Sequence, residues 1–382
     1  METREKIYQW QPVVGQEEID EVVAAVESSW ITEAHRTRHL EELLASWLNV
    51  EHVVLTNNGT VAIALALIAL GIGHGDEVII PDMTFVGTGN AVKLAGAKPV
   101  VVDVRPQDVT IDPREVERAI SKRTKAIIPV HLNGRSAEMR TLKSISKQFL
   151  LPIVEDAAQA LGSRRQGRML GTESVVGCFS LATTKIITTG QGGFIATNDS
   201  DFKKRLTELK DQGRLHRSWN HHPAPGFNFK FTDLQAAIGI AQFKKLPDRL
   251  QRMKAIYSRY RERLEALPAV TFLDFDFESG LSPWFVDIYV HERDELAAFL
   301  DNMGVQTRPF YPPLHTQYDF HAADACPQSI RFSRTGLWLP SSVSLTDEQI
   351  DYVCEAIEVF YDHQSGEKIR SKEKETQDEP AG

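Results

Sequence analysis

The order of strands and helices in the first half of the chain constrains its fold most. From about residue 51 to residue 198, short runs rich in β-branched residues alternate with helical segments, and each run ends in turn or polar residues. This alternation is typical of an α/β domain with a mostly parallel sheet flanked by helices. Seven strands are expected at residues 52–56, 77–81, 98–104, 125–130, 151–156, 177–181 and 192–197, with helices at 61–70, 87–94, 113–120 and 137–149.

A second, smaller domain is expected after the sheet, because a chain of 382 residues exceeds one ordinary core. Residues 232–267 resemble a helix broken near Pro247, and the segments that follow predict an α+β arrangement whose last helix opens with the capping pair Thr346 and Gln349. The sequence therefore predicts an N-terminal arm at 1–15, a large domain at 16–250, a small C-terminal domain at 251–364 and a disordered, highly charged tail at 365–382.

The composition narrows the partners and the compartment. A formal net charge of −9 without a basic stripe argues against nucleic acid and favours a small molecule. Cys178, Cys326 and Cys354 lie far apart without paired spacing, which fits a reducing compartment and neither a disulfide scaffold nor a zinc site. The N-terminus has no apolar stretch of signal-peptide length, and the longest apolar run, from Val61, is too short to span a bilayer. We therefore expect a cytoplasmic protein without a membrane partner.

Polar residues that follow two of the strands carry chemical information. Gly59 and Thr60 stand where a strand gives way to an apolar helix, so free amides, a hydroxyl and the positive helix end meet there, as an anion site requires. A plain helix cap explains the same residues. The strand at 151–156 ends in Glu155 and Asp156, and a buried carboxylate needs a cationic or donor partner. Three interactions would satisfy it: a salt bridge to a basic side chain, capping of the helix that follows, or pairing with the protonated nitrogen of a bound aromatic ring.

Lys185 follows Asp156 one strand later, within FSLATTKIITTGQGG, between an apolar run and a cluster of threonines and glycines. An amine, a carboxylate, a phosphate cradle and a flat side chain are the groups that pyridoxal phosphate requires. Phe85, just past the strand at 77–81, could supply the flat side chain, although core packing is the more common role of a phenylalanine. These residues together suggest a pyridoxal-phosphate enzyme.

A series of motifs spans most of the chain. Over the first 245 residues these are NNGTVA, GHGDEVIIPDMTF, GAKPVVVDV, HLNGRSAEM, VEDAAQALGSRRQGRMLG, FSLATTKIITTGQGG and GFNFKFTDLQAAIGIAQF, and the weaker RPFYPPLH and LWLPSSVSLTDEQI extend the series to about residue 360. With these motifs the chain resembles the DegT/StrS-type sugar aminotransferases, a branch of the fold-type I pyridoxal-phosphate enzymes. The resemblance implies the fold of that class, with a mostly parallel seven-stranded sheet.

The resemblance also implies roles for individual residues, carried over by motif position. Lys185 would form the Schiff base with the cofactor, and Asp156 would hold the ring nitrogen. Gln159 would lie near the phenolic oxygen of the ring, and Phe85 would stack on its face. The phosphate would be held by Gly59, Thr60 and Ser180 and, from the neighbouring subunit, by Asn228. The resemblance therefore implies an obligate homodimer with shared active sites.

Three residues depart from the family pattern. Gln191 stands where the family usually has Glu, Asn133 where it has Tyr, and Lys230 where an Arg is common. Lys230 keeps the charge but removes the planar fork of a guanidinium, which puts a bidentate contact there in doubt. None of the three touches the central chemistry.

Two segments are candidates for substrate contact. The first is basic and contains Arg214, His216, Arg217, His221 and His222. It fits a loop that faces the diphosphate of a nucleotide sugar, and a solvated surface loop is a nearly equal alternative. Metal binding is disfavoured there because the histidines lack acid or thiol partners and a regular spacing, so no metal site is predicted.

The second segment is TRPFYPPLH, residues 307–315, which resembles the corresponding stretch of perosamine synthases. Its prolines would stiffen a loop that presents Arg308, Tyr311 and His315 towards a sugar. A connection between the two domains without any ligand explains the segment nearly as well.

The sequence thus predicts a pyridoxal-phosphate-dependent aminotransferase that moves an amino group from glutamate to a nucleotide-linked keto sugar. The leading candidate for the sugar is a 4-keto-6-deoxyhexose aminated at C4, of the GDP-perosamine type, and the product would enter lipopolysaccharide or O-antigen synthesis. Three alternatives remain: a sugar dehydratase, against which Lys185 argues because related dehydratases carry His there, an aminotransferase acting on a keto-cyclitol, and a non-catalytic sensor that binds the cofactor.

Overall fold

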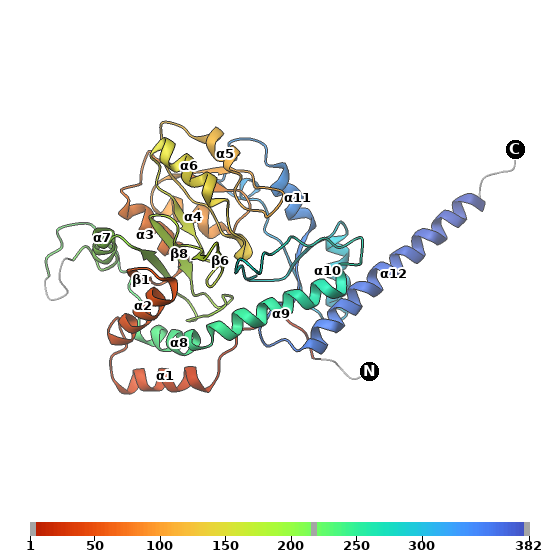
Figure 1. The fold of residues 1–382 in the computed structure, drawn as a ribbon, viewed down its shortest axis with the longest axis horizontal. Coiled ribbons are helices and arrows are strands. Elements are labelled where there is room, and N and C mark those ends of the chain that lie inside the picture. Colours follow the sequence, from red (N-terminus) through yellow and green to blue (C-terminus); the bar gives the residue numbers. More distant parts are fainter. Residues whose placement is uncertain (1–4, 215–219, 378–382) are drawn as a thin grey trace.

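The large lobe has a central sheet with helices around it (Figure 1). Among the described residues, seven strands form this sheet. The computed structural model describes residues 5–214 and 220–377, and its strands pair in the orders β1-β9-β8-β5 and β3-β2-β4. Parallel bridges from Ile127 to Ile153 and from Val130 to Asp156 place β4 beside β5. All neighbours are parallel except β9, which runs antiparallel to β1 and β8. The predicted α/β fold and its strands are confirmed: β1 (His52–Thr56), β2 (Glu77–Pro81), β3 (Lys98–Val102), β4 (Thr124–Ile127), β5 (Val154–Asp156), β8 (Val176–Ser180) and β9 (Gly193–Thr197).

The strand directions decide where a ligand can bind. Six of the seven strands run the same way, so their carboxyl ends share one edge of the sheet. At that edge Gly59 follows β1, Phe85 follows β2, Asp156 ends β5 and Ser180 ends β8. This edge is where open α/β sheets bind their ligands.

Four predicted helices connect these strands: α3 (Gly59–Ala69), α4 (Val86–Leu94), α5 (Pro113–Ala119) and α6 (Met139–Phe149). Helix α3 is apolar on every side and nearly every residue in it is buried, as expected of a helix enclosed by the protein. Its N-cap is Asn58, whose side chain accepts a hydrogen bond of 2.9 Å from the amide of Val61.

Other elements of the large lobe are not among those predicted. They are α1 (Gln16–Glu27), α2 (His35–Leu48), the hairpin β6 (Arg164–Arg165) and β7 (Arg168–Met169), and α7 (Ser200–Lys210). Both α1 and α2 pack against α8 (Asp233–Lys244). The buried carboxylate of Asp233 accepts hydrogen bonds from the amides of Ala34, Arg36 and Thr37 at the start of α2. This carboxylate satisfies amides that have no partner within their own helix, and it fixes α2 to α8.

The small lobe has an antiparallel sheet in the order β10-β12-β11, made of β10 (Asp287–Tyr289), β11 (Arg308–Pro309) and β12 (Gly336–Trp338). Its helices are α9 (Leu246–Leu264), α10 (Arg293–Asn302), α11 (Pro327–Thr335) and α12 (Asp347–Gln377), and a short 3-10 turn lies at Leu314–Thr316. A second 3-10 turn, Leu132–Gly134, follows β4 in the large lobe. The capping pair is present, because Thr346 and Gln349 each accept a hydrogen bond from the other's amide. Helices α9 and α12 lie side by side (Figure 1).

The largest buried apolar cluster extends through both lobes and includes Leu40, Phe179, Tyr257 and Leu337. Helix α12 continues to Gln377, into the segment for which the sequence predicts a charged tail. Residues 365–377 are rich in Glu, Lys, Arg and Gln, which have good helix propensity, and a helix that has already formed extends at little cost. Among the described residues, no helix is both long and apolar enough to cross a membrane.

Candidate active site

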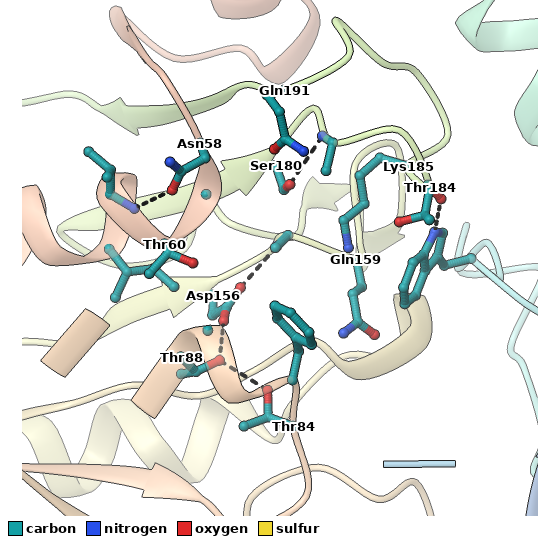
Figure 2. A pocket seen from close by; sticks show the side chains of 18 of the residues that line it. Asn58, Thr60, Thr84, Thr88, Asp156, Gln159, Ser180, Thr184, Lys185 and Gln191 are labelled. Atoms are coloured by element: carbon teal, nitrogen blue, oxygen red, sulfur yellow. Dashed lines mark hydrogen bonds between the residues drawn. The ribbon is translucent and has the colours of Figure 1, made fainter. Parts of the chain in front are cut away.

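A cavity of about 520 Å³ opens at the carboxyl edge of the sheet (Figure 2). Its volume lies within the range of small-molecule sites. The starts of α3 and α4 form part of its wall, together with the end of β5. From these two helix starts the wall takes Asn58, Gly59, Thr60, Val61, Ile63, Thr84, Phe85, Gly87 and Thr88. The small lobe contributes Trp284, Arg308 and Tyr311. Of the predicted site residues, the wall contains Gly59, Thr60, Phe85, Asp156, Gln159, Ser180, Lys185, Arg308 and Tyr311.

Lys185 extends its side chain into this cavity from the loop between β8 and β9 (Figure 2). Its Nζ lies 3.8 Å from the ring centroid of Trp284, and the indole of Trp284 donates a hydrogen bond of 2.6 Å to the carbonyl of Thr184. Burial lowers the pKa of Lys185 to about 7, although the charge of Asp156 acts in the opposite direction. A substantial fraction of this amine is therefore unprotonated, and nucleophilic, at neutral pH.

Asp156 lies in the same cavity and is almost fully buried. Its Oδ2 accepts a hydrogen bond of 2.7 Å from Thr88 Oγ1, and its Oδ1 accepts one of 3.0 Å from the amide of Ala158. Burial nevertheless raises the pKa of Asp156 above its ordinary value. The ionised carboxylate is thus incompletely compensated by its present neighbours, and a cationic partner in the cavity would stabilise it.

The neighbouring carboxylate, Glu155, faces away from this chemistry. It is completely buried and accepts hydrogen bonds from His131 Nε2 and from the amides of Gly171, Glu173 and Ser174. Although burial opposes ionisation, the bonds from His131, Ser174 and Gly171 hold the pKa of Glu155 below its ordinary value. Glu155 therefore anchors the loop that precedes β8 and stabilises the strand end from which Asp156 projects.

The start of α3 offers donors for an anion. The amides of Gly59 and Thr60 lie in the first turn, where no carbonyl of the helix can accept their hydrogen bonds. A Cβ at Gly59 would lie 3.0 Å from Ser180 Cβ, so a side chain there would crowd the Ser180 hydroxyl. Ser180 Oγ accepts a hydrogen bond from the amide of Ala182, which leaves its own proton free to be donated.

Three further predicted residues line the other side of the cavity. Phe85 is 50% exposed and lies 6.0 Å from the ring of Tyr311. Gln159 donates a hydrogen bond of 3.3 Å to Tyr311 and accepts one of 2.8 Å from the amide of Asn133. The Gln159 amide group is therefore held between the two lobes.

Sequence reasoning missed three wall residues that the geometry identifies: Thr84, Thr88 and Trp284. Thr84 and Thr88 lie within the motif PDMTFVGTG that was noted for Phe85, four residues apart, and their hydroxyls are 3.0 Å from each other. Helical spacing from Phe85 could have identified Thr88. Trp284 belongs to the small lobe, and no local signal connects it to Lys185.

Asn133 and Arg135 hold the segment that carries Trp284. Asn133, which replaces the family's usual Tyr, has a φ of 55°, a left-handed conformation that Asn tolerates. Its side chain accepts a hydrogen bond from the amide of Phe285 and donates one to the carbonyl of Phe285. Arg135 forms a buried ion pair with Asp287, with distances of 2.7 and 2.8 Å. Asn133, where the family usually has Tyr, therefore links the two lobes and does not line the cavity.

Several predicted residues lie away from the cavity wall. Asn228 is exposed, and it pairs with Asp211 in a single antiparallel bridge. Arg214 and Lys230 form ion pairs of 2.6 and 2.8 Å with the same Asp211. His222 Nδ1 lies 2.7 Å from the carbonyl of Gln212, and His221 is exposed. His216 and Arg217 lie outside the described residues.

His315, predicted to face a sugar, does not line the cavity either. Its amide and its Nδ1 contact the two oxygens of Asp82 at 2.8 and 2.7 Å. Asp82 precedes the wall residues of α4, and residues 308–311 precede His315, so this pair joins two segments of the wall. Asp82, His315 and Cys326 have atoms able to bind a metal ion, and these atoms lie within 4.8 Å of one another. The sequence predicts no metal site for the protein. His315 thus contacts Asp82 and is not on the cavity wall, and its contact with a sugar stays a prediction.

The two other residues that depart from the family pattern are Gln191 and Lys230. Gln191 lines the wall, and its carbonyl accepts hydrogen bonds from Gln235 Nε2 and Thr189 Oγ1. The ammonium of Lys230 forms an ion pair of 2.8 Å with Asp211.

The donor set of the cavity fits pyridoxal phosphate. Lys185 offers an amine whose pKa is lowered to about 7, and Asp156 offers a buried carboxylate. The amides of Gly59 and Thr60 and the Ser180 hydroxyl offer donors to a phosphate at a helix N-terminus. Phe85 offers a flat face. The charge and hydrogen-bond character at each position is the one that the cofactor needs.

Comparison with known proteins identifies relatives along nearly the whole chain. Residues 12–358 match the model of the DegT/DnrJ/EryC1/StrS aminotransferase family. GDP-perosamine synthase of Caulobacter vibrioides is 34% identical over 356 residues, which are 91% of this chain and 96% of that protein. The crystal structure of an aminotransferase of this family from Brucella abortus has a TM-score of 0.85 at 29% identity, with 90% of this chain and 95% of that chain covered. DesI, solved in the presence of its TDP-sugar product, has a TM-score of 0.88 at 28% identity, with 97% and 96% covered.

Proposed function

The chain belongs to the DegT/DnrJ/EryC1/StrS aminotransferase family and is a pyridoxal-phosphate-dependent sugar aminotransferase. On that basis we propose its two substrates. The amino group comes from glutamate, and the acceptor is a nucleotide-linked 4-keto-6-deoxyhexose, aminated at C4 to a GDP-perosamine-type product. The observation that carries the proposal is the meeting of Lys185, Asp156 and the α3 N-terminus in one cavity. The choice of sugar is supported by the 34% identity to GDP-perosamine synthase.

Lys185 is proposed to hold the cofactor covalently and, once released by the amino donor, to move a proton. When bound, pyridoxal phosphate supplies an electrophilic carbon for amines and a ring that withdraws electrons. The free Nζ of Lys185 takes the α-proton of the amino acid, and it returns a proton in the opposite direction when the keto sugar is aminated. A pKa near 7 suits both directions, because the amine then accepts and donates protons with similar ease.

The other wall residues bind and orient. Asp156 keeps a proton on the ring nitrogen, because a protonated ring nitrogen would stabilise this buried carboxylate, whose pKa is raised by burial. Gly59, Thr60 and Ser180 hold the phosphate, Gln159 approaches the ring oxygen and Phe85 covers one face of the ring. The indole of Trp284 packs against Lys185 and excludes water on that side.

We further propose a homodimer with shared sites. Asn228 is exposed and lies off the cavity wall of its own chain, as expected of a residue that completes the phosphate site of a partner. Helix α1 supports the proposal, because Ile19, Val23 and Val26 lie at helical spacing and each is about half exposed. A second copy of the chain would bury these apolar side chains.

The remaining proposals concern substrate approach and context. The segment with Arg214, His221 and His222 is proposed to face the diphosphate of the nucleotide sugar, and breaking the Arg214–Asp211 pair would free a guanidinium for it.

The buried free thiols of Cys178, Cys326 and Cys354 suit the cytoplasm, where the sugar nucleotides of cell-surface polysaccharides are assembled. Residues 16–250 and 251–364 are retained as the two proposed domains, with 1–15 as the N-terminal arm.

The test is a panel of acceptors with glutamate as donor. The purified protein is incubated with GDP-4-keto-6-deoxymannose, its UDP and dTDP counterparts and a free keto-cyclitol, and the amino sugars are measured by mass spectrometry. K185A is the control for uncatalysed transfer. We expect turnover of the GDP sugar. Exclusive turnover of the cyclitol would refute the nucleotide-sugar proposal, and turnover of only a UDP or dTDP sugar would correct the nucleotide.

A further inference from the structure

The N-terminal arm, at residues 7–13, is attached to the small lobe on both sides of Trp10. Three contacts attach it: Ile7 pairs with Val305 in a parallel bridge, the carbonyl of Gln9 accepts a hydrogen bond of 2.9 Å from the amide of Ser341, and the carbonyl of Gln11 accepts one of 2.9 Å from Ser342 Oγ. The backbone of the arm is therefore held in place where the side chain of Trp10 leaves it.

The indole of Trp10 reaches the loop that carries Lys185. Its Nε1 donates a hydrogen bond of 3.1 Å to the carbonyl of Thr183. The indole of Trp284 donates one of 2.6 Å to the next carbonyl, that of Thr184. Two indole N–H groups, one from the arm and one from the small lobe, thus hold the two residues that directly precede Lys185.

The arm is also linked to the residue that follows Lys185. The buried guanidinium of Arg249 donates a hydrogen bond of 3.0 Å to the carbonyl of Ile186 and one of 2.8 Å to the carbonyl of Val13. Gln242 Nε2 donates a further hydrogen bond of 2.9 Å to the same carbonyl of Val13. The arm therefore contacts, directly or through one side chain, the backbone on both sides of Lys185.

The position of this backbone matters for the chemistry of Lys185. Within the part of the chain that the structure describes, the cavity wall includes Lys185 and Trp284 but not Trp10. A displacement of about 1 Å in a reacting group can lower a rate about 100-fold. A loop that moves also admits water to Nζ, and hydration favours the charged form of the amine. Loosening of this loop therefore changes both where Nζ lies and how readily it is protonated.

We propose that Trp10 is a positioning residue for Lys185, and that its hydrogen bond to Thr183 keeps Nζ directed at the reacting carbon in both halves of the reaction. The proposal rests on the proposed function, because Trp10 acts through Lys185. Since Trp10 lies off the cavity wall, its loss slows the chemical step and leaves the affinity for both substrates nearly unchanged.

The first test uses the holoenzyme and the variant Trp10→Phe. The ring of Trp10 lies 5.4 Å from that of Phe285, and the variant keeps an aromatic ring there but loses the N–H. Absorbance follows single turnovers with glutamate and, separately, with the keto sugar. We expect both rates to fall about 10-fold, because Lys185 moves the proton in both halves, and the half-saturating concentrations to stay within about twofold of wild type.

Trp47→Phe is the matched control. Trp47 lies in α2, and its buried indole N–H has no acceptor among the described residues, so this variant removes an indole N–H without removing a hydrogen bond. We expect its single-turnover rates to equal those of wild type. Circular dichroism and the midpoint of urea unfolding check that both variants are folded.

The second test needs neither cofactor nor turnover. The full-length, cofactor-free protein is labelled with a trace of acetic anhydride between pH 6 and pH 10, and mass spectrometry measures the label on Lys185. The charged groups that act on Lys185 are Asp156 and Arg308, and neither belongs to the arm. In Trp10→Phe we expect labelling to fall about fivefold at pH 7 and to stay within about twofold of wild type at pH 9, because a hydrated amine keeps its proton at neutral pH.

Two outcomes would overturn the role of Trp10. One is a single-turnover rate in Trp10→Phe equal to that of wild type. The other is an equal change of labelling at pH 7 and pH 9, since a general loss of structure does not depend on the protonation of Lys185. The proposed function fails separately, when the wild-type enzyme converts no amino acid, and labelling of Lys185 then still decides about Trp10.

Discussion

Thr88 donates a hydrogen bond of 2.7 Å to Asp156 Oδ2, and its hydroxyl lies 3.0 Å from that of Thr84 (Figure 2). These two threonines connect the first turn of α4 to the carboxylate at the end of β5. The bond restrains the Asp156 carboxylate and leaves its remaining lone pairs for a ligand in the cavity.

Removal of the Thr88 hydroxyl should therefore slow the chemistry without emptying the site. In Thr88→Val, the carboxylate loses one of its two donors, and we expect the single-turnover rate with glutamate to fall about 10-fold to 100-fold. Thr88→Ser restores the hydroxyl and should recover most of the rate. A rate in Thr88→Val equal to that of wild type would show that the bond does not position Asp156.

Asp156→Asn tests the carboxylate itself. A neutral amide cannot stabilise a protonated ring nitrogen as a carboxylate does, so the ring withdraws electrons less well. We expect the cofactor to remain bound and the single-turnover rate to fall at least about 100-fold, which corresponds to about 2.7 kcal/mol. Unchanged single-turnover rates would refute the pairing of Asp156 with the ring.

The pKa of Lys185 predicts how cofactor attachment depends on pH. Because burial lowers this pKa to about 7, the amine is protonated and unreactive below pH 7 and free above it. In the cofactor-free protein, the rate of covalent attachment should rise about tenfold per pH unit below pH 7 and level off above about pH 8. Free lysine, with a pKa of about 10.4, is the control and should continue to gain reactivity up to about pH 10. A protein rate that still rises tenfold per unit at pH 9 would contradict the low pKa.

Mixing two inactive variants tests the proposed shared site. Lys185→Ala and Asn228→Ala chains should each be weak alone, because one lacks the amine and the other lacks a contact to the partner's phosphate. In a mixed dimer one of the two sites contains both native residues, so about half of the wild-type activity per mixed dimer is expected. Absence of any recovery, after subunit exchange has been demonstrated with labelled chains, would count against the shared site.

Arg135→Met tests how much the ion pair between Arg135 of the large lobe and Asp287 of the small lobe stabilises the fold. Its ion pair with Asp287 is completely buried, so the variant would leave a buried carboxylate that, among the described residues, keeps only the hydrogen bond from Tyr289. Loss of one partner of a buried pair costs about 3–5 kcal/mol. We expect a clear decrease in the urea concentration at the midpoint of unfolding. Lys6→Met is the control, because the Lys6–Asp301 pair is exposed and its loss should barely shift the midpoint.

Local patterns were sufficient to predict the central sheet. Strands of alternating or continuous β-branched residues, and the apolar helix α3 between them, are encoded within stretches of five to eleven residues. The parallel order then requires Gly59, Asp156 and Ser180 to share one edge, which is why these residues could be assigned to one site from motifs alone. The amphipathic α1 and α2 also have local patterns, but neither has a Ser, Thr, Asp or Asn at its N-cap, where Gly15 and Ala34 stand, so the usual start signal is missing.

Tertiary structure decided which distant residues complete the site. Trp284 reaches Lys185 and Arg308 reaches the cavity because Asn133 and Arg135 hold residues 285–287 and because β11 pairs with β12. His315 binds Asp82 instead of lining the cavity, although both belong to recognisable motifs. The contacts of Asn133 with Phe285, of Arg135 with Asp287 and of Asp82 with His315 join residues 152 or more positions apart. Periodicity describes only neighbours along the chain. The sequence by itself determined the sheet and the chemical groups, whereas side-chain packing between the lobes determined which of those groups face the same cavity.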